Sequence, residues 1–76
     1  MDISEETFIA NLGTHIRQLR EKKGLSQQAL ADDCDIKKNQ IGRIERAEIN
    51  TTVKTLIKIA NALDIKPKEL FDFPLK

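Results

Sequence analysis

Two short amphipathic segments separated by a tight turn constrain the fold of this chain more than any other feature. Their sequences are Leu25-Ser26-Gln27-Gln28-Ala29-Leu30-Ala31 and, ten residues further on, Ile41-Gly42-Arg43-Ile44-Glu45-Arg46. Ser26 has the hydroxyl that caps a helix N-terminus, and Ala31 is small enough for a second helix to approach closely. Ile41 and Ile44 share one side of the second segment. The pattern predicts two helices and a turn over about residues 26–46, with the outer face of the second helix free.

Apolar residues recur at helical spacing in the rest of the chain as well. A first helix is predicted over about residues 5–23, capped by Ser4 and ended by Gly24, and a fourth over about 53–63, capped by Thr52. A short fifth helix is predicted from Pro67 through Phe71. The stripes expected to face the core are Phe8, Leu12, Ile16 and Leu19 in the first helix, and Val53, Leu56, Ile59, Ala60 and Leu63 in the fourth.

The size and composition indicate one compact all-α domain over residues 1–76 with an aliphatic core. The chain has room for one core only, and just 4% of its residues are aromatic. A single cysteine and a single histidine cannot form an internal disulfide or a zinc site, so we expect no metal or other cofactor. Cys34 falls on an apolar face and is expected in the core, whereas His15 falls on a polar face and is expected at the surface.

Several classes of protein are disfavoured by what the sequence lacks. No apolar run approaches the length of a membrane span, and the acidic start at Asp2, Glu5 and Glu6 is unlike a signal peptide. We therefore expect a cytoplasmic protein without a membrane partner. No nucleophile–base arrangement, phosphate loop or metal cluster is apparent, so neither catalysis nor a small-molecule substrate is expected.

The charges are nearly balanced in total but unevenly distributed along the chain. The formal net charge is +1, which is modest for a protein that binds nucleic acid. Residues 14–23 nevertheless contain four basic residues and one acidic residue, and so do residues 36–46. This distribution suits a DNA-binding face, although a solvated surface of ion pairs would give the same pattern.

From Leu12 to Phe71 the chain resembles the helix-turn-helix transcription factors of the phage repressor and Cro type (XRE-like). The motifs that carry the resemblance are Ile16-Arg17-Gln18-Leu19-Arg20, Leu25-Ser26-Gln27, Leu30-Ala31, Ile41, Ile44-Glu45, Leu56-Ile57-Lys58-Ile59-Ala60-Asn61-Ala62-Leu63 and Glu69-Leu70-Phe71. The resemblance implies a compact five-helix, lambda repressor-like domain of bacterial or phage origin. It also implies a regulator that binds operator double-stranded DNA, either a repressor or a controller of the restriction–modification type.

Three polar residues of the predicted third helix are candidates for contact with DNA bases. Lys38, Asn39 and Arg43 share the face opposite Ile41 and Ile44. Lysine and arginine can pair with guanine, and asparagine with adenine, in the major groove. An ordinary solvated helix face would show the same residues. Gly42, on the same face, is expected to allow close approach of the helix backbone to DNA or the packing of a neighbouring helix.

Further polar residues around this helix are candidates for contact with phosphates. Gln27 opens the second helix, where free backbone N–H groups favour an anion. Lys37 and Arg46 flank the third helix with positive charge, and Asn50 and Thr51 follow it in a loop.

Other assignments follow from the resemblance. Glu45 would repel phosphates unless it has a partner, and the resemblance implies an ion pair with Arg20 that holds two helices together. The chain departs from the family pattern at the turn and around the third helix. Asp35 replaces a glycine, Lys37 replaces a hydroxyl cap, and Arg46-Ala47 replaces an asparagine–glycine pair. Each replacement is expected to cost some local stability, about 1 kcal/mol for a lost cap.

Apolar residues near the C-terminus suggest self-association. Phe71, Phe73 and Leu75 lie within five residues and are predicted to form a homodimer interface, so that residues 64–76 are the dimerisation segment. Phe71 can alternatively cap the bundle of its own chain. A two-fold dimer would place two recognition helices in half-sites about 34 Å apart. The near-neutral charge keeps a second interpretation open, namely an antitoxin-like or bridging module that binds protein.

Overall fold

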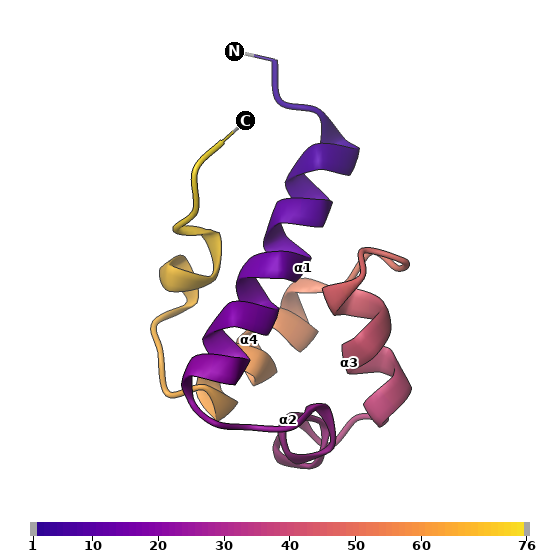
Figure 1. The fold of residues 1–76 in the computed structure, drawn as a ribbon, viewed down its shortest axis with the longest axis vertical. Coiled ribbons are helices and arrows are strands. Elements are labelled where there is room, and N and C mark those ends of the chain that lie inside the picture. The colour runs from indigo at the N-terminus through magenta and orange to yellow at the C-terminus, as the bar shows by residue number, and fades with distance from the viewer. Residues whose placement is uncertain (1, 76) are drawn as a thin grey trace.

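The computed structural model describes residues 2–75 and is helical throughout, with no strand in that range. The elements, in chain order, are α1 (Glu5–Lys22), α2 (Gln27–Cys34), α3 (Lys38–Glu45), α4 (Val53–Ala62) and η1 (Pro67–Phe71) (Figure 1). The all-α class is therefore confirmed.

The fifth predicted helix is not an α-helix. η1 is a short 3₁₀ helix, so residues 2–75 form four α-helices rather than five. The segment begins at Pro67, and its start is closed by the Glu69 carboxylate, which accepts from the Lys66 backbone N–H at 2.7 Å. Five residues suffice for a tight 3₁₀ turn, whereas a stable α-helix needs a longer run of hydrogen bonds.

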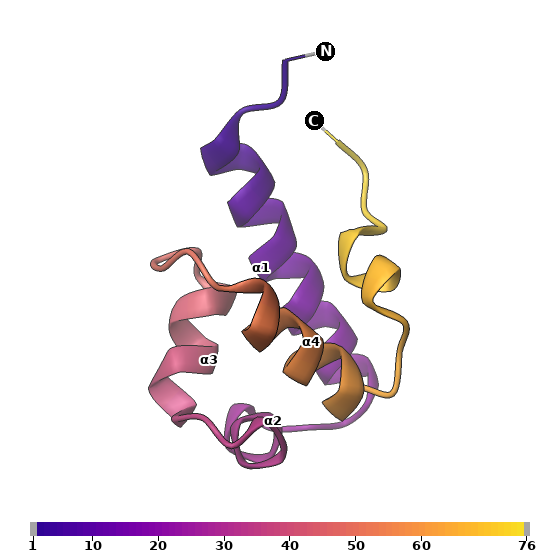
Figure 2. The same ribbon diagram turned by 180° about the vertical axis from the view of Figure 1, so that it is seen from behind.

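The helices pack in pairs, with the longest helix, α1, against α3 and η1, and with α2 against α4. α2 and α3 pack against each other at one end of the molecule, and α3 also contacts α1. In the view from behind, α4 lies between α3 and η1 (Figure 2). Residues 67–75 then return along α1, so that both ends of the described chain lie at the end opposite α2.

Three hydroxyl side chains begin the helices as predicted. The Oγ of Ser4 accepts from the Thr7 N–H, that of Ser26 from the Ala29 N–H, and the Oγ1 of Thr52 from the Thr55 N–H. α3 differs, because Lys37 stands at its cap position and its side chain makes no capping hydrogen bond.

Left-handed residues follow the helices. Gly24 after α1 has a φ of 73°, and Asp35 in the turn of the helix-turn-helix motif has a φ of 56°. Gly24 follows the first helix as predicted. Ala47 after α3 and Asp64 after α4 have φ values of 59° and 56°. A left-handed backbone is costlier for alanine than for glycine, asparagine or aspartate.

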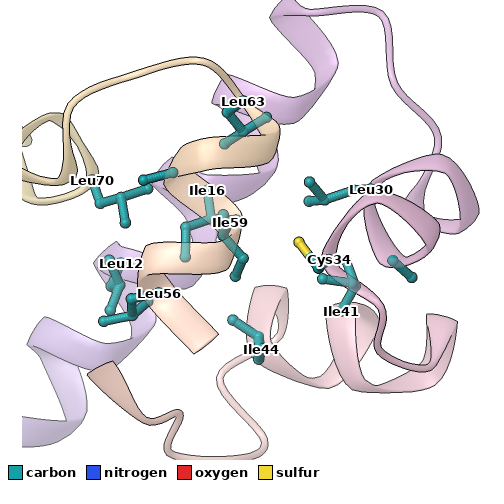
Figure 3. Close-up of a cluster of buried hydrophobic side chains, with 12 residues drawn as sticks. Leu12, Ile16, Leu30, Cys34, Ile41, Ile44, Leu56, Ile59, Leu63 and Leu70 are labelled. Atoms are coloured by element: carbon teal, nitrogen blue, oxygen red, sulfur yellow. The ribbon is translucent and has the colours of Figure 1, made fainter. Parts of the chain in front are cut away.

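The core is aliphatic, as predicted (Figure 3). Ile16 of α1 and Ile59 of α4 both belong to it and are fully buried. Its largest fully buried residues are Ile16, Leu30, Ile41, Ile59, Leu63 and Leu70. Val53 does not belong to this core and is 74% exposed, so its predicted burial is wrong. It lies in the first turn of α4, toward the outer side that also carries Ile57.

Candidate nucleic-acid interface

The outer face of α3 presents the three candidate base-contacting residues. Lys38, Asn39 and Arg43 are exposed, while Ile41 and Ile44 on the inner side are 1% and 3% exposed. Asn39 and Arg43 are one helical turn apart, so their side chains leave the helix in similar directions. The hydrophobic inner side thus fixes which polar groups the helix offers to solvent.

A buried ion pair anchors the end of α3 to α1. Arg20 Nε donates to Glu45 Oε2 at 2.6 Å, and Arg20 Nη2 donates to Glu45 Oε1 at 3.0 Å. The third nitrogen, Nη1, donates to the Leu25 carbonyl at 2.8 Å. These hydrogen bonds to Glu45 raise the pKa of the Arg20 guanidinium. The ion pair that the resemblance implied is present, so the Glu45 charge is balanced within the chain.

Close packing of α1 against α3 brings this pair together. A Cβ on Gly13 would lie 2.5 Å from the Ile44 carbonyl oxygen and 2.7 Å from that of Glu45. Only glycine leaves room for this approach of two backbones. The close contact at Gly13 was not predicted, because a lone glycine inside an amphipathic pattern does not reveal which helix it faces.

Gln27 is linked to the same ion pair. Its Nε2 donates to Glu45 Oε1 at 3.1 Å, a bond that the sequence did not predict. One amide proton of Nε2 therefore remains for another acceptor. The backbone N–H of Gln27 lies in the first turn of α2, where backbone N–H groups have no partner within the helix. Gln27 thus retains two donors with which it can contact a phosphate.

Arg46 and Gln27 fill the space above Gly42. A Cβ on Gly42 would lie 2.9 Å from Arg46 Nη1 and 3.5 Å from Gln27 Oε1. The glycine therefore accommodates two side chains of its own chain. Gly42 is buried in consequence, and the group offered to solvent at this point of α3 is the Arg46 guanidinium.

Glu48 is a partner of Arg46 that the sequence analysis did not identify. Arg46 Nε donates to Glu48 Oε2 at 2.7 Å, and Arg46 Nη2 donates to Glu48 Oε1 at 3.4 Å. These hydrogen bonds raise the pKa of Arg46 and lower the pKa of Glu48. The sequence did contain a signal for this ion pair, namely two opposite charges two residues apart at the end of a helix.

The remaining candidate phosphate contacts differ in how they are placed. Lys37 and Asn50 are exposed. The Thr51 hydroxyl oxygen is buried and has no hydrogen-bond partner among the described residues. Thr51 can therefore meet a phosphate only through its backbone.

The apolar C-terminal residues pack partly against their own chain. The ring centroid of Phe73 lies 5.2 Å from that of Phe8 and 5.5 Å from that of His15. The ring centroid of Phe71 lies 6.1 Å from that of Phe8. Phe71 is still 43% exposed and Leu75 is 51% exposed.

His15 is not the isolated surface residue that was expected. Its Nε2 donates to the Glu69 carbonyl at 2.8 Å, because the C-terminal segment folds back along α1. The spacing within α1 placed His15 on the polar side correctly but carried no information about this distant segment.

Within residues 2–75, no helix combines the length and apolar character that a membrane span requires. No cluster of three or more histidine, cysteine, aspartate or glutamate side chains suited to a metal ion occurs among the same residues.

Comparisons with known proteins agree with this geometry. A family model described as helix-turn-helix matches residues 16–70. The chain is 40% identical over 62 residues to the control protein C.BamHI of Bacillus amyloliquefaciens, covering 80% of this chain and 76% of that relative. Its sequence is also 40% identical to that of the restriction-modification controller protein C.AhdI from Aeromonas hydrophila. The crystal structure of that protein matches with a TM-score of 0.82, covering 83% of this chain and 96% of the C.AhdI chain. A mutant of the controller protein C.Esp1396I, solved bound to its highest-affinity operator site, is 28% identical with a TM-score of 0.81, covering 90% of both chains.

Proposed function

The chain belongs to the helix-turn-helix family of transcriptional regulators, and from this premise we propose that it binds operator DNA sequence-specifically as a homodimer. The exposed polar face of α3, anchored by the buried Arg20–Glu45 pair, carries the proposal. A rigidly held helix with a free polar side is what insertion into a major groove requires. The proposed activity is binding, without a chemical step.

Base recognition is assigned to Asn39, Arg43 and Lys38. The guanidinium of Arg43 can donate twice to guanine O6 and N7, and the amide of Asn39 can pair with adenine N6 and N7. Lys38 can serve either a guanine or a neighbouring phosphate. Since these residues extend over less than two turns of α3, one subunit reads only a few base pairs.

Backbone contacts are assigned to residues at both ends of the motif. Gln27 offers its remaining amide proton and its backbone N–H, and Lys37 and Asn50 offer exposed side chains. Arg46 and the Thr51 backbone complete the set. Such contacts fix the register of the protein on DNA without selecting a sequence.

A second copy of the chain is the proposed partner of the exposed apolar residues. Residues 64–76 were predicted as the dimerisation segment, and Phe71 and Leu75 remain exposed there. Ile57 and Val53 on the outer side of α4, exposed by 39% and 74%, extend the candidate surface. Phe73 contributes mainly to the fold of its own chain. Two recognition helices related by a two-fold axis would read half-sites about 34 Å apart.

A selection from random duplexes tests base recognition. The bound pool should be enriched in a two-fold symmetric motif. On that motif, Arg43→Ala should cost about 1–3 kcal/mol of binding free energy and relax the preference at one base position. Arg17→Ala, which removes an exposed arginine of α1, is the matched control. No enriched motif, or equal losses for Arg43→Ala and Arg17→Ala, would contradict the assignment.

Gln27→Ala separates phosphate contact from base contact. The variant should bind every duplex more weakly by a similar factor, since a phosphate contact carries no sequence information. A loss confined to one sequence would assign Gln27 to a base instead. Circular dichroism melting shows whether loss of the Glu45 contact has altered the fold.

Sedimentation equilibrium tests the homodimer. The wild-type chain should sediment as a dimer at tens of micromolar, and the double variant V53K/I57K should shift toward monomer. Monomer alone in the wild-type sample would overturn this part of the proposal.

The names of C.BamHI and C.AhdI favour a controller role. For such a role, the operator should lie beside methyltransferase and endonuclease genes.

A further inference from the structure

One of the cations beside the recognition helix is not free. Arg46 has two of its three guanidinium nitrogens on the two oxygens of Glu48, at 2.7 and 3.4 Å. The side chains of Arg46 and Glu48 are 57% and 49% exposed, and Arg46 stands at the C-cap of α3, the helix proposed to meet DNA. This contrasts with the Arg20–Glu45 pair, which is buried and structural.

The position of Arg46 is set by Gly42 as well as by Glu48. The guanidinium lies against Gly42, with Nη1 2.9 Å from where a Cβ would stand. It is therefore held on the outer side of α3 beside Gln27. Nη1 stays available to an acceptor from outside, while Nε and Nη2 face the carboxylate.

We propose that Glu48 is a specificity-determining residue, which neutralises Arg46 toward unrelated DNA and so lowers the affinity for random sequence. The inference rests on the proposed function, and it names the residue that limits non-specific binding at the same interface. Non-specific affinity comes almost wholly from phosphates neutralised by cations. A cation that already has an anion beside it adds little to the number of phosphates that the protein neutralises.

The pair is weak enough to open when DNA is held correctly. Exposed ion pairs contribute little to stability because water and salt screen them. A phosphate kept in place by the other contacts of an operator complex can therefore replace Glu48 on Arg46. On a random duplex, where those contacts are absent, the internal pair persists. The modest net charge of +1 is consistent with such a restraint.

The experiment compares four variants on a random-sequence duplex by fluorescence anisotropy over a salt series. They are E48Q, R46Q, the double variant R46Q/E48Q, and the control E21Q, which removes the partner of Arg17 in another exposed ion pair. E48Q should bind about 3- to 10-fold more tightly at low salt and steepen the salt dependence by about 0.9 in log–log slope. E21Q should change affinity less than about 2-fold, because its charge lies in α1 rather than beside α3.

The double variant shows whether Glu48 acts through Arg46. In the R46Q background, E48Q should change affinity no more than E21Q does in the wild type. An equal effect of E48Q in both backgrounds would overturn the proposal, since Glu48 would then act by general repulsion. Weaker binding of E48Q would overturn it too, because Glu48 would then be orienting Arg46 for contact.

Failure of the proposed function has a different signature. If neither the wild type nor E48Q binds random duplex at low salt, DNA binding itself is wrong. If the wild type binds while E48Q matches E21Q, only the role of Glu48 is wrong. Unchanged melting temperatures, expected for residues this exposed, exclude misfolding as the cause of either result.

Discussion

Gly13 sets the distance between two helices by having no side chain. Its missing Cβ lets the α1 backbone reach the carbonyl groups of Ile44 and Glu45 at the end of α3. That approach places Arg20 within hydrogen-bond distance of Glu45. The orientation of α3 therefore depends on one residue of a different helix.

Gly13→Ala should destabilise the fold by about 1–3 kcal/mol, because the new methyl group must push α3 away from α1. Alanine is the better helix former by up to about 1 kcal/mol, which offsets part of this loss. Urea unfolding followed by circular dichroism measures the difference. Thr14→Ala, on the exposed side of the same turn, should be close to neutral. A Gly13→Ala variant as stable as the wild type would show that the two helices can separate freely.

Cys34 should make stability depend on pH in the alkaline range. Burial raises the pKa of the Cys34 thiol above its ordinary value. Below about pH 8 the thiol is protonated in both states and contributes no pH dependence. Above about pH 8.5 the unfolded chain loses the proton while the folded chain keeps it. The free energy of unfolding then falls as pH rises, by up to about 1.4 kcal/mol for each unit separating the two pKa values.

Urea unfolding under reducing conditions from pH 7 to pH 10 checks this dependence. Cys34→Ala removes the titrating group, so its stability should fall less steeply over the same range. The two proteins differ only at position 34, so the difference between the two curves isolates the thiol. Parallel curves would mean that the folded thiol ionises as readily as the unfolded one.

At the scale of the helices, the sequence predicts beginnings and ends best. The cap hydroxyls of Ser4, Ser26 and Thr52 act on an N–H three residues away, so the signal is local. The character of η1 was not predictable in this way, because Pro67 starts either type of helix. The exposure of Val53 was not predicted for a related reason. Helical spacing does not show which turns of α4 are covered by neighbouring helices.

Ala47→Gly should stabilise the protein at the end of α3. Ala47 has a φ of 59°, which costs an L-residue about 1–2 kcal/mol. Glycine removes that cost but has more freedom in the unfolded chain, so the net gain should be about 0.5–1 kcal/mol.

Thermal and urea unfolding measure the gain, with Asp35→Gly as the comparison. Asp35 has a similar φ of 56°, but aspartate tolerates this conformation better than alanine. Its replacement should therefore help less. If Asp35→Gly stabilised more than Ala47→Gly, the backbone cost would not explain the result.

At the scale of the whole molecule, the sequence predicted which residues share the outer face of α3 but not how that face is supported. Lys38, Asn39 and Arg43 follow from helical periodicity alone. The bond between Gln27 and Glu45 joins residues 18 positions apart, and that between His15 and Glu69 joins residues 54 positions apart. Periodicity within one helix contains no information about such pairs.

Phe73→Ala should destabilise the folded monomer, because Phe73 holds the C-terminal segment on α1 through Phe8 and His15. The expected loss is about 1–2 kcal/mol for a half-buried aromatic ring. Leu75→Ala should leave monomer stability nearly unchanged, since Leu75 is 51% exposed. Urea unfolding at a concentration below dimerisation measures both. Equal losses for the two variants would show that the segment is anchored by other groups.

Both ends of the described chain lie at the end of the molecule opposite α2. A tag, fluorophore or additional domain fused at either end would therefore emerge on the side remote from the α2–α3 motif. The same geometry suits a tandem protein, in which a flexible linker joins the tail of one copy to the head of the next. Such a covalent pair would couple two recognition helices at any dilution, without relying on mass action.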